Sequence, residues 1–361
     1  MAKLGEVCLL KAGKFVSAND ISPEYNKGLY PCFGGNGIRG YVADYTHDGE
    51  FPLIGRQGAL CGNVNLASGK FHATEHAVVV QPKIEMNVHW LYYALNAMNL
   101  GQYATGAAQP GLAVSKLETL SIEIPNISEQ NKIAQTLYKV EQLVNFRKQQ
   151  LAKLDELVKA QFVEMFGDIN VNNKKWMTYP LGELCTIVRG GSPRPIERYL
   201  GGTIPWIKIG DATTGENIYL NSTKEYIIQE GVKKSRMIKA GSLIFANCGV
   251  SLGFARIITF DGCIHDGWLA MEDIDEKLDK IFLLYSLNQM TEYFRKTAPA
   301  GTQPNLNTNI MKMHRQIVPP MEMQKAFISF VKCADRQKQI VQQSLEKLEL
   351  MKKALMQEYF G

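Results

Sequence analysis

The chain has 361 residues, and its 40 Lys+Arg against 35 Asp+Glu give a formal charge of +5 at pH 7. A hydrophobic content of 45% and a charged content of 21% are ordinary globular values, which excludes fibrous and disordered classes. No apolar run reaches the ~18 residues of a membrane span, and the first residues lack the apolar core of a signal peptide. Seven cysteines without a Cys-x-x-Cys pair argue against a disulfide framework and a thiolate zinc site. We therefore expect a cytoplasmic protein with reduced thiols and no membrane partner.

Residues 1–125 combine short β-type runs such as His76–Val80 with one helical stretch, Val88–Met98. Gly35–Gly40 spells Gly-x-Gly-x-x-Gly, but no helical period follows it, so a glycine-rich turn is a better interpretation than a dinucleotide site. His72–His76 spells a His-x-x-Glu-His zinc motif, but it continues into a strand, where the two histidines would lie ~13 Å apart. Neither motif predicts a catalytic or metal site.

Residues 126–167 show a helical pattern. Apolar positions recur at alternating spacings of four and three from Ile133 onward, interrupted only at Arg147. Asn126, with Glu129 three residues on, offers a capping box for the start of this helix. A helix of ~40 residues would be ~60 Å long at 1.5 Å per residue.

Residues 168–320 repeat the mixture of short β-type runs and one helical stretch. The runs are Ile204–Ile209, Ser242–Ala246 and Phe254–Phe260, and the helical stretch is Leu278–Phe294. Pro319-Pro320 then delimits a last segment, residues 321–361, in which the heptad spacing returns. The order predicts two mixed α/β domains with β-rich cores, each followed by a long helix.

A self-comparison of the chain indicates an internal duplication. Leu154–Gly167 matches Leu348–Gly361, and Leu4–Glu6 matches Leu181–Glu183. The period is far too long for a solenoid, so it predicts two domains built alike. The two helices either lie each on its own domain or pack together as an antiparallel coiled coil, and polar residues in the seam favour the coiled coil. The expected seam consists of Leu137, Val140, Val144, Leu151, Leu154, Val331, Val341, Leu345, Leu348 and Leu355.

Several stretches of the two halves carry a resemblance to a known family. In the second half they are Ile204–Asp211, Gly241–Gly249 and Gly301–Asn307, followed by Ile317–Pro320, Gln324 and the long helix. The first half has the same order, with Gly106–Gly111, Ile122–Pro125 and then Gln130. Over essentially its whole length, the chain resembles the specificity subunit of type I restriction-modification systems.

The resemblance implies an α/β (α+β) architecture of four parts. They are target recognition domain 1 at residues 1–125, a conserved spacer helix at 126–167, target recognition domain 2 at 168–320 and a second conserved spacer helix at 321–361. Each recognition domain would read one half of a bipartite, asymmetric site in double-stranded DNA, and the helices would fix the distance between the half-sites.

The resemblance also implies the partners and the chemistry of the assembled complex. The chain would be non-catalytic and would bind no metal or cofactor. It would dock two methyltransferase subunits and the restriction/translocase subunits, and S-adenosylmethionine, ATP and Mg are implied for those partners. The complex would be an adenine-specific DNA methyltransferase and type I site-specific deoxyribonuclease.

Base reading favours Arg, Lys, Asn and Gln on glycine-rich loops that can approach a groove. On this basis the candidate DNA contacts of the first domain are Arg39, Arg56, Gln57, Lys70 and His72. Those of the second are Arg189, Ser192, Arg194, Lys208, Lys233, Lys234, Arg236 and Asn247. A solvated surface charge is the alternative for each. Gln109 and Gln303 recur in both halves, so we expect them to hold shared structure, and we expect Trp206 and Trp268 in the core.

Two other functions stay open on the sequence: a stand-alone DNA-modifying enzyme, and a coiled-coil scaffold that binds only protein. The chain has no Walker lysine motif, no Gly-x-Ser-x-Gly elbow and no Asn/Asp-Pro-Pro-aromatic methylase motif. These missing motifs argue against the enzyme.

Overall fold

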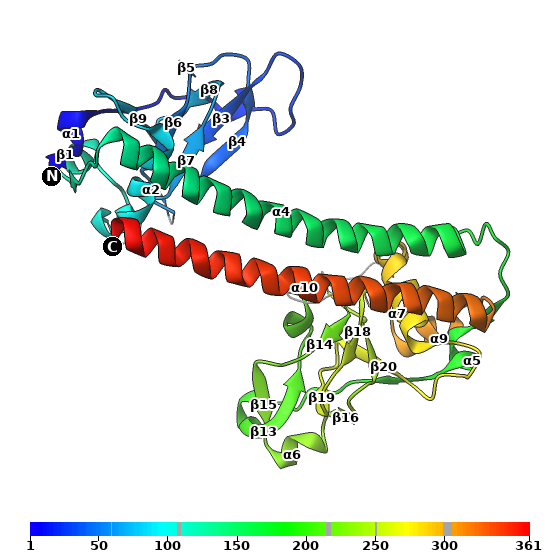
Figure 1. Ribbon diagram of the computed structural model, residues 1–361. Helices are drawn as coiled ribbons and strands as arrows, with labels where there is room; N and C mark the ends of the chain where they lie inside the picture. The colour runs from blue at the N-terminus through cyan, green and yellow to red at the C-terminus, as the bar shows by residue number, and fades with distance from the viewer. Residues whose placement is uncertain (59, 107–109, 214–217, 250, 299–304) are drawn as a thin grey trace. The chain divides into compact units, whose positions relative to one another are not determined.

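The computed structural model describes residues 1–58, 60–106, 110–213, 218–249, 251–298 and 305–361. These residues form two compact units, one of Met1–Gln149 with Val341–Gly361, the other of Gln150–Ile340 (Figure 1). Each unit therefore contains part of α4 (Ile127–Phe166) and part of α10 (Met321–Phe360). Gln109 and Gln303, for which we expected a shared structural role, lie outside the described residues.

The first unit contains two four-stranded sheets. One has the order β2 (Cys8–Ala12), β9 (Ala77–Pro82), β6 (Phe51–Gly55), β7 (Val64–Ala67), and the other β4 (Gly37–Val42), β3 (Tyr30–Gly34), β8 (Lys70–Ala73), β5 (His47–Asp48). Only β3 and β8 pair in parallel among these strands. Strand β9 is buried on both faces, because Val78 and Val80 pack toward the helices whereas Ala77 and Val79 pack between the sheets.

The two motifs set aside on the sequence lie in strands and in the turns between them. Gly35 lies in the turn between β3 and β4. His72 lies on β8, whereas Glu75 and His76 lie in the turn before β9, so the second motif does not run along one strand as the sequence predicted. Gly37 has a φ of +94°, which glycine adopts without strain.

Helix α2 (Val88–Ala97) lies in the helical layer of the first unit. The Asn87 side chain caps its first turn by accepting a hydrogen bond from the Trp90 N–H at 2.9 Å. Its buried Trp90 and Leu91 share one core with Ile133 of α4, and Leu355 of α10 packs against the same core. The two long helices thus complete the hydrophobic core of this unit.

The second unit contains a five-stranded and a four-stranded sheet. The first has the order β12 (Thr186–Arg189), β20 (Trp268–Glu272), β17 (Leu243–Ala246), β18 (Ala255–Ile258), β14 (Tyr219–Leu220), and the second β15 (Glu225–Ile227), β13 (Leu200–Ile207), β19 (Gly262–Ile264), β16 (Arg236–Ile238). The two tryptophans expected in the core, Trp206 and Trp268, are buried.

The helical stretch expected at Leu278–Phe294 is divided into α7 (Lys280–Gln289) and α8 (Thr291–Thr297). The break follows from a tertiary contact, since the Thr291 hydroxyl donates to the Gly253 carbonyl at 2.6 Å and to the Asn288 carbonyl at 2.9 Å. The shorter helices are α1 (Leu4–Val7), α3 (Val114–Glu118), α5 (Leu181–Leu184), α6 (Gln229–Val232), α9 (Thr308–Met313) and the 3₁₀ turns Ala18–Asp20, Leu100–Tyr103, Ile196–Arg198 and Ile209–Ala212.

In each unit a two-stranded ribbon joins the start of the β-rich segment to its end. Strand β1 (Ala2–Lys3) pairs with β10 (Ser121–Ile122), and β11 (Thr178–Pro180) pairs with β21 (Arg315–Ile317), both antiparallel. Each ribbon closes its segment shortly before the long helix begins.

Helices α4 and α10 pack together in antiparallel orientation, as the heptad pattern predicted. In the first unit Glu141 pairs with Lys352 at 2.6 Å, and in the second unit Asp155 pairs with Lys338 at 2.5 Å. Residue numbers therefore rise along α4 as they fall along α10. Of the expected seam residues, the buried ones are Leu137, Val140, Val144, Val331, Val341 and Leu345, and the half-buried ones are Leu151, Leu154, Leu348 and Leu355.

Candidate nucleic-acid interface

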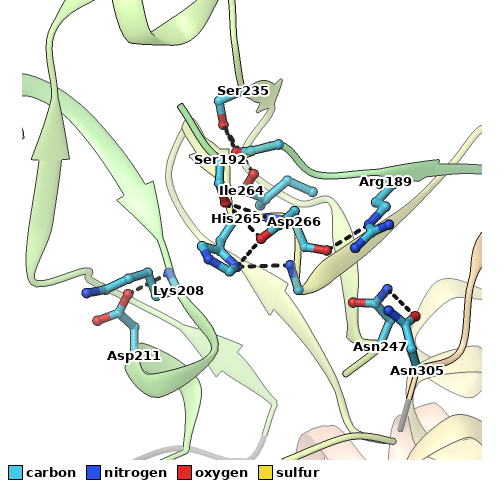
Figure 2. A network of polar contacts seen from close by, with 12 residues as sticks. Arg189, Ser192, Lys208, Asp211, Ser235, Asn247, Ile264, His265, Asp266 and Asn305 are labelled. Atoms are coloured by element: carbon cyan, nitrogen blue, oxygen red, sulfur yellow. Dashed lines mark hydrogen bonds and ion pairs between the residues drawn. The ribbon is translucent and has the colours of Figure 1, made fainter. Parts of the chain in front are cut away.

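Loops from both sheets of the second unit converge on one polar network, which Figure 2 shows. Strand β12 ends at Arg189, β13 is followed by Lys208, β17 by Asn247, and β19 by His265 and Asp266. Because β12 and β17 both pair with β20, the residues that follow these strands are neighbours in space. Sheet pairing thus assembles the network from segments far apart in the sequence.

Two glycines allow the loop after β12, residues 190–194, to lie against the turn between β19 and β20. The Gly190 N–H donates to the Trp268 carbonyl at 2.9 Å, and the Gly191 N–H to the Ile264 carbonyl at 3.0 Å. A Cβ atom on Gly190 would lie 2.1 Å from the His265 carbonyl oxygen. Only glycine fits this close main-chain approach.

Asp266 holds this loop and the residue before it by hydrogen bonds, to Ser192 and to Arg189. Its carboxylate Oδ1 accepts from the Ser192 hydroxyl at 2.8 Å, while its N–H donates to the same hydroxyl oxygen at 3.3 Å. Its carbonyl oxygen accepts from Nε of Arg189 at 2.9 Å (Figure 2). The guanidinium of Arg189 is therefore fixed in orientation although the residue is exposed. Arg194, at the end of the loop, is also exposed.

The ring of His265 lies against Trp206, with 5.4 Å between ring centroids. Burial lowers the pKa of His265, while the charge of Asp266, whose Oδ1 lies 2.9 Å from Nδ1, acts in the opposite direction. The Gly267 N–H lies 2.9 Å from the same Nδ1, which favours the neutral ring with its proton on Nε2. A protonated ring would instead donate from Nδ1 to Asp266.

Lys208 and Asn247 are held by neighbours inside the unit. The ammonium of Lys208 forms an ion pair with Glu225. Asn247 is fully buried, and its side-chain amide lies 3.4 Å from Oδ1 of Asn305. In this structure Asn247 thus connects the end of β17 to the segment that leads into α9.

The three basic residues at 233–236 lie beside this network rather than in it. Lys233 caps the end of α6, Lys234 donates to the Tyr199 hydroxyl at 2.6 Å, and Arg236 lies on β16. Ser235 connects them to the network, because its hydroxyl donates to the Gly191 carbonyl at 2.8 Å.

The first unit repeats the main-chain hydrogen bonds of this network. The Gly13 N–H donates to the Ala77 carbonyl at 3.0 Å, as Gly190 does to Trp268. The loop after β2 is therefore fixed on β9, with which β2 pairs, and the loop after β12 is fixed on β20, with which β12 pairs.

A second main-chain bond is shared in the same way. The Arg56 N–H donates to the His76 carbonyl at 3.0 Å, and the Asn247 N–H to the Gly267 carbonyl at 2.9 Å. Arg56 thus occupies the position of Asn247. We call these paired bonds, one from Gly13 or Gly190 and one from Arg56 or Asn247, the main-chain frame.

The side chains on the frame of the first unit leave several buried polar atoms without a hydrogen-bond partner among the described residues. Such atoms are Nε of Arg56, Oε2 of Glu75 and Nδ1 of both His72 and His76. His72 is buried, with Nε2 3.2 Å from the Lys14 carbonyl oxygen. Unpaired buried polar groups are costly, so each of these atoms would gain from a hydrogen-bond partner.

Three other candidates of the first unit face outward. Arg39 on β4 and Gln57 after β6 are exposed. Lys70 is also exposed, and its ammonium lies 4.7 Å from the centre of the Tyr45 ring. They present hydrogen-bond donors on the surface.

Sequence reasoning missed His265, Asp266 and Asn305. Basic and amide side chains flanked by glycine were the expected base readers, whereas Asp266 acts partly through its main-chain oxygen, which every residue has. Asn305 belongs to the Gly301–Asn307 stretch that carried the family resemblance, and its proximity to Asn307, the N-cap of α9, was the available signal.

The described residues contain no group of three or more His, Cys, Asp or Glu able to hold a metal ion. In the same part of the chain, no helix combines the length and the apolar character that crossing a bilayer requires.

Comparison with known proteins assigns the chain to a family. Residues 1–156 and 173–350 match the family described as type I restriction modification DNA specificity domain. The chain is 53% identical over 143 residues to the type I restriction enzyme EcoprrI specificity subunit of Escherichia coli, a match covering 39% of this chain and 36% of that protein. It is 24% identical over 315 residues to the type I restriction enzyme MjaIX specificity subunit of Methanocaldococcus jannaschii, covering 78% and 72%.

The fold has a solved counterpart. The type-I restriction-modification system S subunit from M. genitalium superposes with a TM-score of 0.62 at 18% identity, covering 99% of this chain and 95% of that one. With the family matched in both halves, the chain belongs to the type I restriction modification DNA specificity family, whose members supply sequence specificity and not catalysis.

Proposed function

We propose that the chain reads a bipartite, asymmetric target in double-stranded DNA, one half-site with each unit. The main-chain frame supports this proposal, because both units build it with the same hydrogen bonds and place different side chains on it. Where the first unit has Arg56 and Glu75, the second has Asn247 and Asp266. Similar scaffolds with dissimilar side chains suit two unlike sequences.

The proposed boundaries are target recognition domains at residues 1–125 and 168–320, with spacer helices at 126–167 and 321–361. Exposed side chains near the two frames are the proposed direct DNA contacts, whereas the buried Asn247 and His72 and the partly buried Arg56 shape the loops. The exposed ones are Arg39, Gln57, Lys70, Arg189, Arg194, Lys233, Lys234 and Arg236, and the half-buried Ser192 and Lys208 complete the proposed DNA-binding set.

We further propose that α4 and α10 set the distance between the half-sites and carry docking surfaces for two methyltransferase subunits and for restriction/translocase subunits. Their exposed apolar side chains support docking, since Phe146 is 59% and Leu350 68% exposed. S-adenosylmethionine, ATP and Mg would be bound by those partners, none by this chain, in a complex that acts in the cytoplasm as adenine methyltransferase and deoxyribonuclease.

Exchange of one recognition domain tests the function. Residues 1–125 are replaced by the corresponding segment of another family member, and methylated sites are mapped in cells that also produce the methyltransferase subunit. One half of the methylated motif should change while the other half stays. A change in both halves, or in neither, would contradict the assignment of one half-site to each unit.

A further inference from the structure

We propose that Arg189 reads a guanine base of the second half-site, and that Ser192 and Asp266 are positioning residues for this contact. The inference rests on the function proposed above and assigns one base-reading side chain within it. Arginine recognises guanine by donating two parallel hydrogen bonds to O6 and N7 in the major groove.

The side chain of Arg189 has the donors that this contact requires. A guanidinium has five N–H groups, and in Arg189 the Nε–H is used by the carbonyl oxygen of Asp266 at 2.9 Å. Its two terminal nitrogens have no hydrogen-bond or ion-pair partner among the described residues. A guanidinium anchored through Nε keeps its Nη edge available for a planar, bidentate acceptor.

The anchor itself is rigid. Arg189 is the last residue of β12 and pairs with Leu269 of β20, so its main chain is part of the five-stranded sheet. The carbonyl that accepts from Nε belongs to Asp266, which the Ser192 hydroxyl holds by two hydrogen bonds, 2.8 Å and 3.3 Å long. Fixing the side chain before binding lowers the entropy lost on contact, which favours base reading over a loose phosphate contact.

Four other candidate cations of the second unit do not combine an anchored side chain with free terminal donors. Lys208 forms an ion pair with Glu225, and Lys234 donates to the Tyr199 hydroxyl, so both ammonium groups already have a partner inside the unit. Arg194 and Lys233 are exposed, and no described residue anchors their side chains, which suits contacts with phosphate oxygens that need charge but little precision. Arg189 alone among these five combines an anchored stem with free terminal donors.

The substitution Arg189→Lys keeps the positive charge and removes the planar fork. The matched control is Arg315→Lys, because Arg315 is also exposed and anchored, with Nε 3.0 Å from the Thr178 hydroxyl and Nη2 2.8 Å from its carbonyl, but on the ribbon of β11 and β21. Both variants and the wild type are assembled with their methyltransferase subunits, and methylated sites are mapped in cells.

The wild-type complex tests the proposed function separately from the role of Arg189. If the sites that it methylates share no bipartite motif, the proposed function is wrong, whatever the role of Arg189. Given such a motif, Arg189→Lys should relax one G·C position of the second half-site and leave the first half-site unchanged. Arg315→Lys should reproduce the wild-type motif. An unchanged motif in Arg189→Lys, or a second half-site without any G·C pair, would overturn the inference.

A binding assay tests the inference if the Arg189→Lys complex methylates no DNA. It measures the affinity of the purified complexes for synthetic duplexes. Each guanine of the second half-site is replaced in turn by 7-deazaguanine, which lacks the N7 acceptor but leaves the phosphates intact. Wild-type affinity should fall about tenfold at one guanine, and the fall should be several-fold smaller in the Arg189→Lys complex, because lysine can still donate to N7 but lacks the planar fork. A uniform loss of affinity in Arg189→Lys, with the wild-type sensitivity to 7-deazaguanine retained, would identify a structural or phosphate-binding role and refute base reading.

Ser192→Ala tests the positioning role. Removing the hydroxyl deletes both of its bonds to Asp266 without touching the guanidinium. Discrimination at the Arg189 position should fall several-fold while affinity for duplexes altered elsewhere stays at the wild-type level. Unchanged discrimination would remove Ser192 from the proposal.

Discussion

Glu141 of α4 and Lys352 of α10 form an ion pair in the first unit, with 2.6 Å between Oε1 and Nζ. The other carboxylate oxygen of Glu141 accepts from the Tyr93 hydroxyl at 2.8 Å. Burial and the charge of Glu141 both raise the pKa of Tyr93, which keeps this hydroxyl protonated. One carboxylate therefore joins both long helices to α2.

Removing the positive charge of Lys352, which pairs with Glu141, should lower the free energy of unfolding measurably. The side chains of Lys352 and Glu141 are 33% and 27% exposed, so Lys352→Met should lower the free energy of unfolding in urea by about 1–2 kcal/mol. The control is Lys148→Met, because Lys148 pairs with Glu349 at 2.9 Å but both side chains are about half exposed. That control should cost under about 0.5 kcal/mol, and equal losses in the two variants would contradict the argument from burial.

Gln324, in the first turn of α10, should be among the most sensitive polar residues of the second unit. It is fully buried, accepts from the Asp279 N–H at 2.8 Å, and donates to the carbonyls of Pro319 and Lys277 at 2.8 and 2.9 Å. Gln324→Ala leaves these groups unpaired, so we expect a loss of about 2–4 kcal/mol. Hydrogen exchange at the Asp279 amide should accelerate in parallel.

Gln130 provides the matched comparison in the first unit. It accepts from the Asn87 N–H at 2.9 Å and donates to the Pro125 carbonyl at 2.8 Å, one bond fewer than Gln324. Gln130→Ala should therefore cost less than Gln324→Ala. The reverse order of losses would show that these hydrogen bonds do not govern the two positions.

Mild acid should weaken the second unit through His314. Burial lowers its pKa to about 4, whereas the unfolded chain has the ordinary value of about 6.5. The unfolded state thus takes up the proton first, and stability that is complete above pH 6.5 is lost as the pH falls toward 4. His314→Phe, which keeps a ring against Phe294, should flatten the dependence of the unfolding midpoint on pH in this window. An unchanged slope would assign the acid sensitivity to other groups.

If α4 and α10 set the gap between half-sites, their length should determine it. Inserting four residues after Lys148 adds about 6 Å at 1.5 Å per residue. The methylated motif should gain one or two unspecified base pairs and keep both half-sites, because one base pair occupies about 3.4 Å of duplex. A two-residue insertion, which rotates Leu151 and Leu154 out of the seam, should instead impair folding. A four-residue variant that methylates with the original gap would refute the spacer role.

Features with a local period were predictable from the sequence. The heptad positions of both helices and the Asn126 cap, which accepts from the Glu129 N–H at 3.0 Å, follow from spacing along a few turns. The strand pattern after His76 and the glycine turn at Gly35 are equally local. Polar residues in the seam favoured pairing of the two helices, because these residues need partners on the opposite helix.

Features that depend on contacts between distant segments were not predictable. The break between α7 and α8 comes from the bond of Thr291 to Gly253, and no helix propensity encodes that contact. The equivalence of Arg56 and Asn247 is likewise carried by main-chain bonds, so their side chains show no similarity. Sequence spacing gave no signal for Asp266, since its carbonyl oxygen has no sequence signature.

The ribbons of β1 with β10 and of β11 with β21 bring the entry and exit of each β-rich segment together. A segment whose two ends are paired as strands can vary in length at little entropic cost, because doubling the length of a closed loop costs only about 0.6 kcal/mol. Insertions and deletions between Lys3 and Ser121, or between Pro180 and Arg315, therefore leave the path into the following helix unchanged. The two ribbons therefore allow the β-rich segments to differ in length and composition while two similar long helices follow them.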